Sequence, residues 1–152
     1  MRPFEFRLQS VLRLKMQLLE MEELQLQRLL QTERDLVEQL RQAAAEVRRQ
    51  QKLLLSEEHV IGSILSTYAA FQKDMKHRME KLKEAIEEVR RQQNAQREKV
   101  RQLRTEREML ERLRSRQFRE WRYLADKEIE ALAHESHLNR LVREQSSAGR
   151  GR

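Results

Sequence analysis

An apolar position recurs every seven residues along most of the chain. The row is interrupted only at Glu33, Gln96 and Gln117. Its apolar members are Leu12, Leu19, Leu26, Leu40, Val47, Leu54, Ile61, Tyr68, Met75, Leu82, Val89, Leu103, Leu110, Leu124, Ala131 and Leu138. On a helix of about 3.6 residues per turn, this spacing places the side chains in one stripe that winds slowly around the helix. The pattern therefore predicts a coiled coil, in which the stripe packs against another helix.

One uncharged stretch divides the chain into two arms. Residues 59–72 contain no Asp, Glu, Lys or Arg, and they include Gly62. Because glycine is common at helix ends, we expect a reversal of the chain here. The predicted fold is all-α: an antiparallel two-helix coiled-coil hairpin with a C-terminal helical overhang. A single unbroken helix is the alternative, and it would need a second chain along its whole length.

The expected boundaries follow from this reversal. A single domain, residues 1–145, comprises one arm at about 6–55, a turn at about 55–63 and a second arm at about 64–144. Residues 146–152 are expected to be disordered. A turn nearer Asp74 would shorten the overhang greatly.

Pairing the two arms predicts a register in which the C-terminal end of the second arm has no helix beside it. Leu12 would face Leu110, and the first arm would end near Phe4, opposite Phe118. The second arm then continues for roughly 25 residues, or about 40 Å at 1.5 Å per residue. The overhang carries Trp121, Leu124, Ile129, Leu132, Leu138 and Leu141, which we expect to have no intramolecular partner. An exposed apolar stripe of this length usually marks a binding surface.

The composition narrows the possible functions. Charged residues make up 38% of the 152 residues and aromatic residues 5%, so the chain cannot fill a thick globular core. The three glycines and one proline leave no glycine-rich phosphate loop, and cysteine is absent. His134 and His137 stand one turn apart without further ligands at matching spacing. We therefore expect no catalytic residues, no metal and no cofactor, and hence not an enzyme.

The formal net charge of +7 favours an acidic binding partner. Arginine is dense from Arg97 to Arg122, where guanidinium groups suit the carboxylates of a protein. The interleaved glutamates also fit an ordinary solvated helix face. Aromatic residues for base stacking are nearly missing, so nucleic acid is the weaker option and is not expected as a partner. No run approaches the ~18 apolar residues of a membrane span, and we expect no integral membrane segment.

Three short motifs resemble the FliJ family of bacterial flagellar type III export proteins. From Phe4 to Leu12 the chain reads Phe-Glu-Phe-Arg-Leu-Gln-Ser-Val-Leu, which is similar to the family's F-x-F-R-L-x-x-V-L start. The segment Tyr68-Ala-Ala-Phe71 is similar to its Y-x-x-F segment. Residues 126–133 resemble its later E-Q-K-x-L-D-E-x-A stretch.

The resemblance implies a stalk similar to that of rotary ATPases. Members of the family insert their paired termini into the hexameric export ATPase, promote its assembly and activity, and contact the cytoplasmic part of the export gate. Relatives in virulence secretion systems do the same. The chain would be cytoplasmic, peripheral at the inner face of the cell membrane at the flagellar base, and a monomer when free. Export chaperones are further partners that the resemblance allows.

The resemblance and the overhang together assign two sets of contact residues. Those expected to bind the ATPase ring are Leu8, Val11, Leu12, Trp121, Leu124, Lys127, Ile129 and Leu132. Those expected to face the export gate are Tyr68, Phe71 and Met75, which lie on one helical face and suit core packing equally well. Phe71 lies off the seven-residue row and is the better candidate for exposure. The alternative function is a structural coiled-coil tether that dimerises through its arms.

Overall fold

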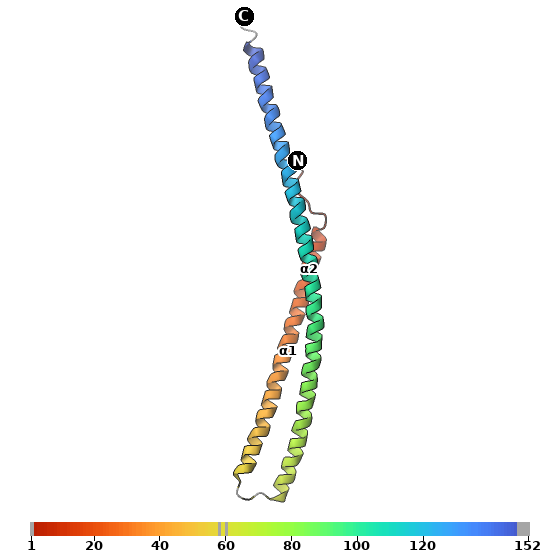
Figure 1. Ribbon diagram of the computed structural model, residues 1–152, viewed down its shortest axis with the longest axis vertical. Coiled ribbons are helices and arrows are strands. Elements are labelled where there is room, and N and C mark those ends of the chain that lie inside the picture. The colour runs from red at the N-terminus through yellow and green to blue at the C-terminus, as the bar shows by residue number, and fades with distance from the viewer. Residues whose placement is uncertain (1, 58, 60, 149–152) are drawn as a thin grey trace. The chain divides into compact units, whose positions relative to one another are not determined.

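Two long helices account for nearly all of the structure (Figure 1). The computed structural model describes residues 2–57, 59 and 61–148. Helix α1 spans Gln9–Ser56 and helix α2 spans Gly62–Ala148. No strand occurs among these described residues. The fold is all-α, with two antiparallel helices packed as a hairpin, as the seven-residue spacing predicts.

The turn lies between Ser56 and Gly62, inside the predicted interval. The Ser56 hydroxyl donates a hydrogen bond to the Leu53 carbonyl over 2.8 Å, where the last carbonyls of α1 lack helical partners. At the start of α2, the backbone N–H of Ile64 donates to the Ile61 carbonyl over 2.9 Å. A Cβ at Gly62 would meet nothing within 4 Å, so the turn does not depend on glycine at this position. A turn near Asp74 is excluded, because Asp74 lies within α2.

The outer helix ends differ from the predicted ones. Helix α1 begins at Gln9 instead of near residue 6, because the preceding residues pack against α2 as an irregular segment. In that segment Phe6 is buried, and its carbonyl accepts the N–H of Gln9 over 2.9 Å. Helix α2 runs to Ala148, so the disorder expected from residue 146 is wrong for residues 146–148, which contain no helix breaker. The expectation for 149–152 lies outside the described residues.

The chain divides into two compact units. The turn unit is Gln17–Arg104, and the terminal unit combines Met1–Met16 with Thr105–Arg152. The apolar side chains buried in the turn unit are Leu19, Ala43, Ile86 and Val100, and those buried in the terminal unit are Phe6 and Leu12. Most other apolar members of the seven-residue row that face the opposite helix are half-buried. The core is therefore one thin layer along the line where the helices meet.

A polar layer crosses the turn unit near two of the interruptions of the seven-residue row. Gln93 and Gln96 are 2% and 6% exposed. The Gln93 amide donates to the Glu33 carboxylate over 2.7 Å and to the Leu29 carbonyl over 3.3 Å. The Gln96 amide donates to the carboxylate and the backbone carbonyl of Glu22. Each buried amide nitrogen is thus hydrogen-bonded, which avoids the cost of burying an unpaired polar group.

Ion pairs between the helices fix the antiparallel register. In the turn unit, Arg104 pairs with Glu23 over 2.6 Å and Arg90 with Glu33 over 2.7 Å. Because the higher number on α1 meets the lower number on α2, the two helices run in opposite directions. In the terminal unit, Lys15 pairs with Glu106 over 2.5 Å.

Candidate partner-binding surface

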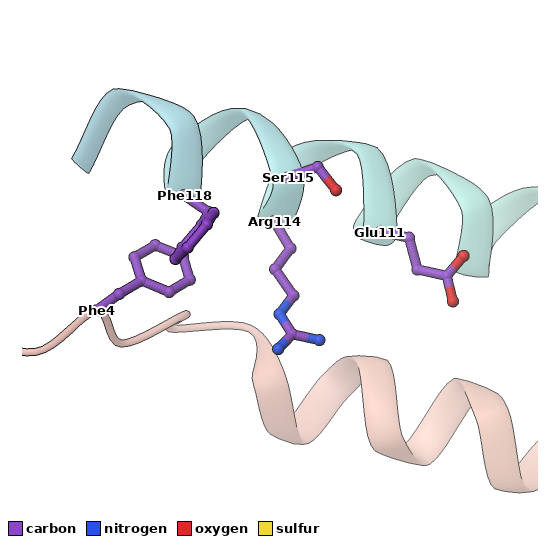
Figure 2. A pocket seen from close by; sticks show the side chains of 5 residues that line it. All are labelled: Phe4, Glu111, Arg114, Ser115 and Phe118. Carbon is purple, nitrogen blue, oxygen red and sulfur yellow. The ribbon is translucent and has the colours of Figure 1, made fainter. Parts of the chain in front are cut away.

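Three aromatic rings meet where the N-terminal segment packs against α2 in the terminal unit. The ring centroid of Phe4 lies 5.3 Å from that of Phe118, in an edge-on arrangement, and 6.0 Å from that of Trp121. The Phe118 and Trp121 rings stack at 5.7 Å. Figure 2 shows Phe4 on the N-terminal segment meeting Phe118 on α2. The first arm therefore ends opposite Phe118, which confirms the predicted register.

Beyond Trp121, helix α2 continues with no second segment of the described residues beside it (Figure 1). Every residue from 126 to 143 is exposed. Leu124 and Leu132 are each 58% exposed, and Ile129 is 64% exposed. Leu138, Leu141 and Val142 are also exposed. The predicted overhang is confirmed, and from Leu124 to Val142 it presents large apolar side chains to solvent over roughly 27 Å of helix.

Two of the residues expected at the ATPase ring are covered instead. Leu12 is only 2% exposed, because its position in the seven-residue row turns it toward α2. Trp121 was expected to be uncovered, but it is half-buried beneath Phe4, and its indole N–H donates to the Arg2 carbonyl over 3.1 Å. These two side chains hold the end of the hairpin together.

The other residues expected at the ring are accessible. Leu8 and Val11 are moderately exposed on the N-terminal side, and Leu124, Ile129 and Leu132 lie on the overhang. Lys127 is exposed, and its ammonium nitrogen lies 4.8 Å from the ring centroid of Tyr123. The apolar positions of the overhang keep the coiled-coil spacing, since Leu132 follows Ala125 by seven residues.

The residues expected to face the export gate lie together in the turn unit. The rings of Tyr68 and Phe71 stack at 6.3 Å, and the Gln72 amide donates to the Tyr68 hydroxyl over 2.9 Å. Phe71 and Met75 line a shallow hollow with Ala43 of α1. All three expected gate residues are half-buried, so Phe71 does not stand out from Tyr68 in exposure as the sequence suggested. The same face could pack internally or receive a partner.

Two carboxyl groups of the turn unit have pKa values shifted by neighbouring side chains, and both groups form ion pairs. Hydrogen bonds from Arg90 and then Gln93 hold the pKa of the Glu33 carboxyl below its ordinary value. A hydrogen bond from Arg101 likewise lowers the pKa of Glu98, one turn away on α2. Both carboxylates form ion pairs with arginine, and the Glu33 side chain is half-buried beside Gln93. Within the described residues there is no cluster of three or more His, Cys, Asp or Glu side chains suited to a metal ion.

Sequence reasoning missed the contact between the N-terminal segment and Trp121. A signal for it was present, because the predicted register places Phe4 opposite Phe118, one turn from the only tryptophan. Aromatic residues are scarce in this chain, and three of them meet at one level of the hairpin.

Searches against protein-family models, curated proteins and solved structures found no match to this chain. In the described part of the chain, neither helix has an apolar stretch long enough to cross a lipid bilayer.

Proposed function

We propose that this chain is a non-enzymatic central stalk of the flagellar type III protein export apparatus. It inserts into the hexameric export ATPase, promotes assembly and activity of the hexamer, and links it to the export gate. It works in the cytoplasm, peripheral to the inner face of the membrane at the flagellar base. The N-terminal, middle and later motifs that resemble the FliJ family support this assignment.

The observation that carries the proposal is the bare overhang of the terminal unit. A single helix with an exposed apolar stripe is costly to leave in water, and such a surface usually belongs to a binding site. A ring with a central opening covers a helix from all sides, which suits a stripe that winds around it. Ile129 and Leu132, at 64% and 58% exposed, are the principal apolar contacts in this proposal.

The remaining residues take supporting roles in the same proposal. Leu8 and Val11 add exposed apolar surface beside the start of the overhang. Leu12 and Trp121 act indirectly, because Leu12 is buried between α1 and α2 and Trp121 bonds to the N-terminal segment. Tyr68, Phe71 and Met75, in the turn unit, form the contact with the cytoplasmic part of the export gate.

The experiment is to add the purified chain to the cognate export ATPase and measure hexamer formation by light scattering and the rate of ATP hydrolysis. We expect the native chain to raise both. The double variant Ile129→Ser, Leu132→Ser should keep its helix content and lose the stimulation. Leu55→Ser is the matched control, since Leu55 is 78% exposed but lies next to the turn. Full stimulation by the double variant would contradict the proposal.

A structural tether that dimerises is the second candidate, and the exposed stripe of the overhang is the observation that favours it. Ion pairs join α1 to α2 within one chain, so these two helices already have each other as partners. Only the overhang is then left to pair with a second copy of the chain. Light scattering of the free chain separates the two functions. A monomer at all concentrations contradicts the tether, and a tight dimer contradicts the stalk.

A further inference from the structure

The arginines of α2 change their surroundings where the hairpin ends. Before that point most of them pair with glutamates, as Arg101 does with Glu98, Arg104 with Glu23, Arg107 with Glu111 and Arg112 with Glu108, whereas Arg97 donates to the Asn94 side chain. From Arg114 onward the pattern stops. Arg114, Arg116 and Arg122 form no ion pair with any described residue, and Arg119 only donates to the Ser115 carbonyl over 3.4 Å. A solvated face with compensating neighbours therefore explains the first group and not the second.

The N-terminal segment adds further arginines to the same place. Arg2, Arg7 and Arg13 also form no ion pair among the described residues, and the segment is held on α2 by the contact of Phe4 with Phe118. Residues 2–13 and 111–122 together contain eight arginines but only three glutamates. We call the arginines without a carboxylate partner the arginine collar: Arg2, Arg7, Arg13, Arg114, Arg116, Arg119 and Arg122. Much of the chain's net charge of +7 is thus gathered around the aromatic rings.

Arg114 occupies the central position in the arginine collar. Its side chain reaches from α2 toward the N-terminal segment, beside the rings of Phe4 and Phe118 (Figure 2). It lines two neighbouring hollows, one with Phe4, Glu111, Ser115 and Phe118, and one with Phe4, Glu5, Phe6, Arg7 and Gln9. Apolar rings at the edge of a hollow lower the local dielectric constant, which strengthens a charge-assisted hydrogen bond formed there.

The residue type favours carboxylates as the ligand. Residues 1–14 and 100–126 contain arginine but no lysine. Arginine presents a planar fork that pairs with a carboxylate through two hydrogen bonds, whereas an anionic lipid surface attracts lysine and arginine alike. The aromatic side chains here pack against one another, so they are not free to stack on nucleic-acid bases.

We propose that the arginine collar binds the carboxylates of an acidic protein surface. This inference rests on the proposed function, from which it follows that the surface belongs to the export ATPase, beside the opening that the overhang enters. The overhang then makes the apolar contact with the ATPase. The arginine collar orients the chain on the ATPase and raises the rate at which the two proteins associate.

The direct test is zero-length cross-linking with a carbodiimide, which joins a lysine amine to a touching carboxylate. The native chain has no lysine between residues 100 and 126, so it is its own control. In the variant Arg116→Lys, Arg122→Lys, mass spectrometry should find amide bonds from both new lysines to Asp or Glu of the export ATPase. Lys73 and Lys76 in the turn unit should give none. Cross-links confined to the turn-unit lysines would overturn the proposal.

A binding measurement tests whether the position of the positive charges matters for binding to the ATPase, or only the net charge of the chain. Arg114→Gln, Arg116→Gln, Arg122→Gln should weaken binding to the export ATPase about tenfold and flatten its dependence on salt. The control Lys73→Gln, Lys76→Gln, Lys81→Gln removes the same charge from the turn unit and should bind normally. Equal losses in the two variants would overturn the proposal, because only net charge would matter.

Three outcomes of these binding experiments distinguish the collar proposal from the proposed function. If binding needs Ile129 and Leu132 but not the arginines, the collar proposal alone fails. If the native chain does not bind the ATPase at all, both proposals fail. Vesicles of phosphatidylethanolamine and phosphatidylglycerol test the membrane: if the triple arginine variant loses vesicle binding but keeps ATPase binding, the ligand is lipid phosphate and the carboxylate assignment is wrong.

Discussion

The indole nitrogen of Trp121 donates a hydrogen bond to the backbone carbonyl of Arg2 over 3.1 Å. Trp121 is the only tryptophan in the chain, and its ring also packs against Phe4. Because no other tryptophan contributes, its fluorescence reports directly on whether the N-terminal segment lies on α2.

Replacing Phe4 by Ala should release this segment. The Trp121 ring then loses its neighbour, so its emission should shift to longer wavelength and acrylamide should quench it more strongly. The free energy of unfolding should fall by about 2 kcal/mol, less than for a fully buried phenylalanine, because Phe4 is half-buried. Phe71→Ala, in the turn unit, should leave the emission unchanged. An unaltered spectrum in Phe4→Ala would show that the segment is not docked in solution.

Leu12→Ala tests whether this residue belongs to the core. Leu12 is 2% exposed, so its truncation should lower the free energy of unfolding by about 2–3 kcal/mol. Val11→Ala is the control on the adjacent, 39% exposed side chain, and it should cost less than about 1 kcal/mol. Urea denaturation followed by circular dichroism measures both. Equal effects of the two substitutions would contradict the register of the terminal unit.

The pKa of Glu33 predicts how stability depends on pH. Its carboxyl has a pKa below the ordinary value of 4.5, mainly because Arg90 hydrogen-bonds to the charged form. A depressed pKa means that the folded state holds the proton less tightly than the unfolded state, so the stabilisation is present above pH 4.5 and is lost as the pH falls toward the folded-state pKa.

Glu33→Gln should therefore be less stable than the native chain at neutral pH, and the difference should shrink as the pH is lowered below 4.5. Urea midpoints at a series of pH values measure this. The shift at Glu98 is common to both proteins and cancels in the comparison. A difference that stays constant across the range would mean that Glu33 does not form this ion pair.

The buried glutamines should govern specificity more than stability. Gln93→Leu, Gln96→Leu would add apolar packing but leave the half-buried carboxylates of Glu33 and Glu22 without these donors, so the melting temperature should fall only slightly. The same change removes side chains that bond only in one register, so dimers and shifted pairings should appear in light scattering. Gln92→Leu, on the exposed face of α2, should do neither. A variant that stays strictly monomeric would show that ion pairs such as Arg90 with Glu33 suffice to select the hairpin.

The hairpin, its register and its bare end could be predicted from the sequence because they depend on spacing alone. The seven-residue row from Leu12 onward fixes which faces meet, and the uncharged stretch around Gly62 fixes where the chain reverses. The level at which Phe4 meets Phe118 then follows from counting residues.

Other features depend on contacts that spacing does not encode. The start of α1 moves to Gln9 because burial of Phe6 outweighs the helical tendency of its neighbours. The seven-residue row marks Glu33 and Gln96 as interruptions, but their partners Gln93 and Glu22 lie off that row and reach it only through long side chains. The half-burial of Trp121 likewise depends on an irregular segment whose path no periodicity describes.

The change from two chain segments to one at Trp121 also creates a step in width. A lone helix with its side chains is about 10–12 Å across, and the irregular N-terminal segment packed beside it at Phe4 makes the chain wider there. An opening of intermediate diameter would pass the overhang and stop at the ring of Phe4. The ring of Phe4 would thus limit how far such an opening could pass along α2.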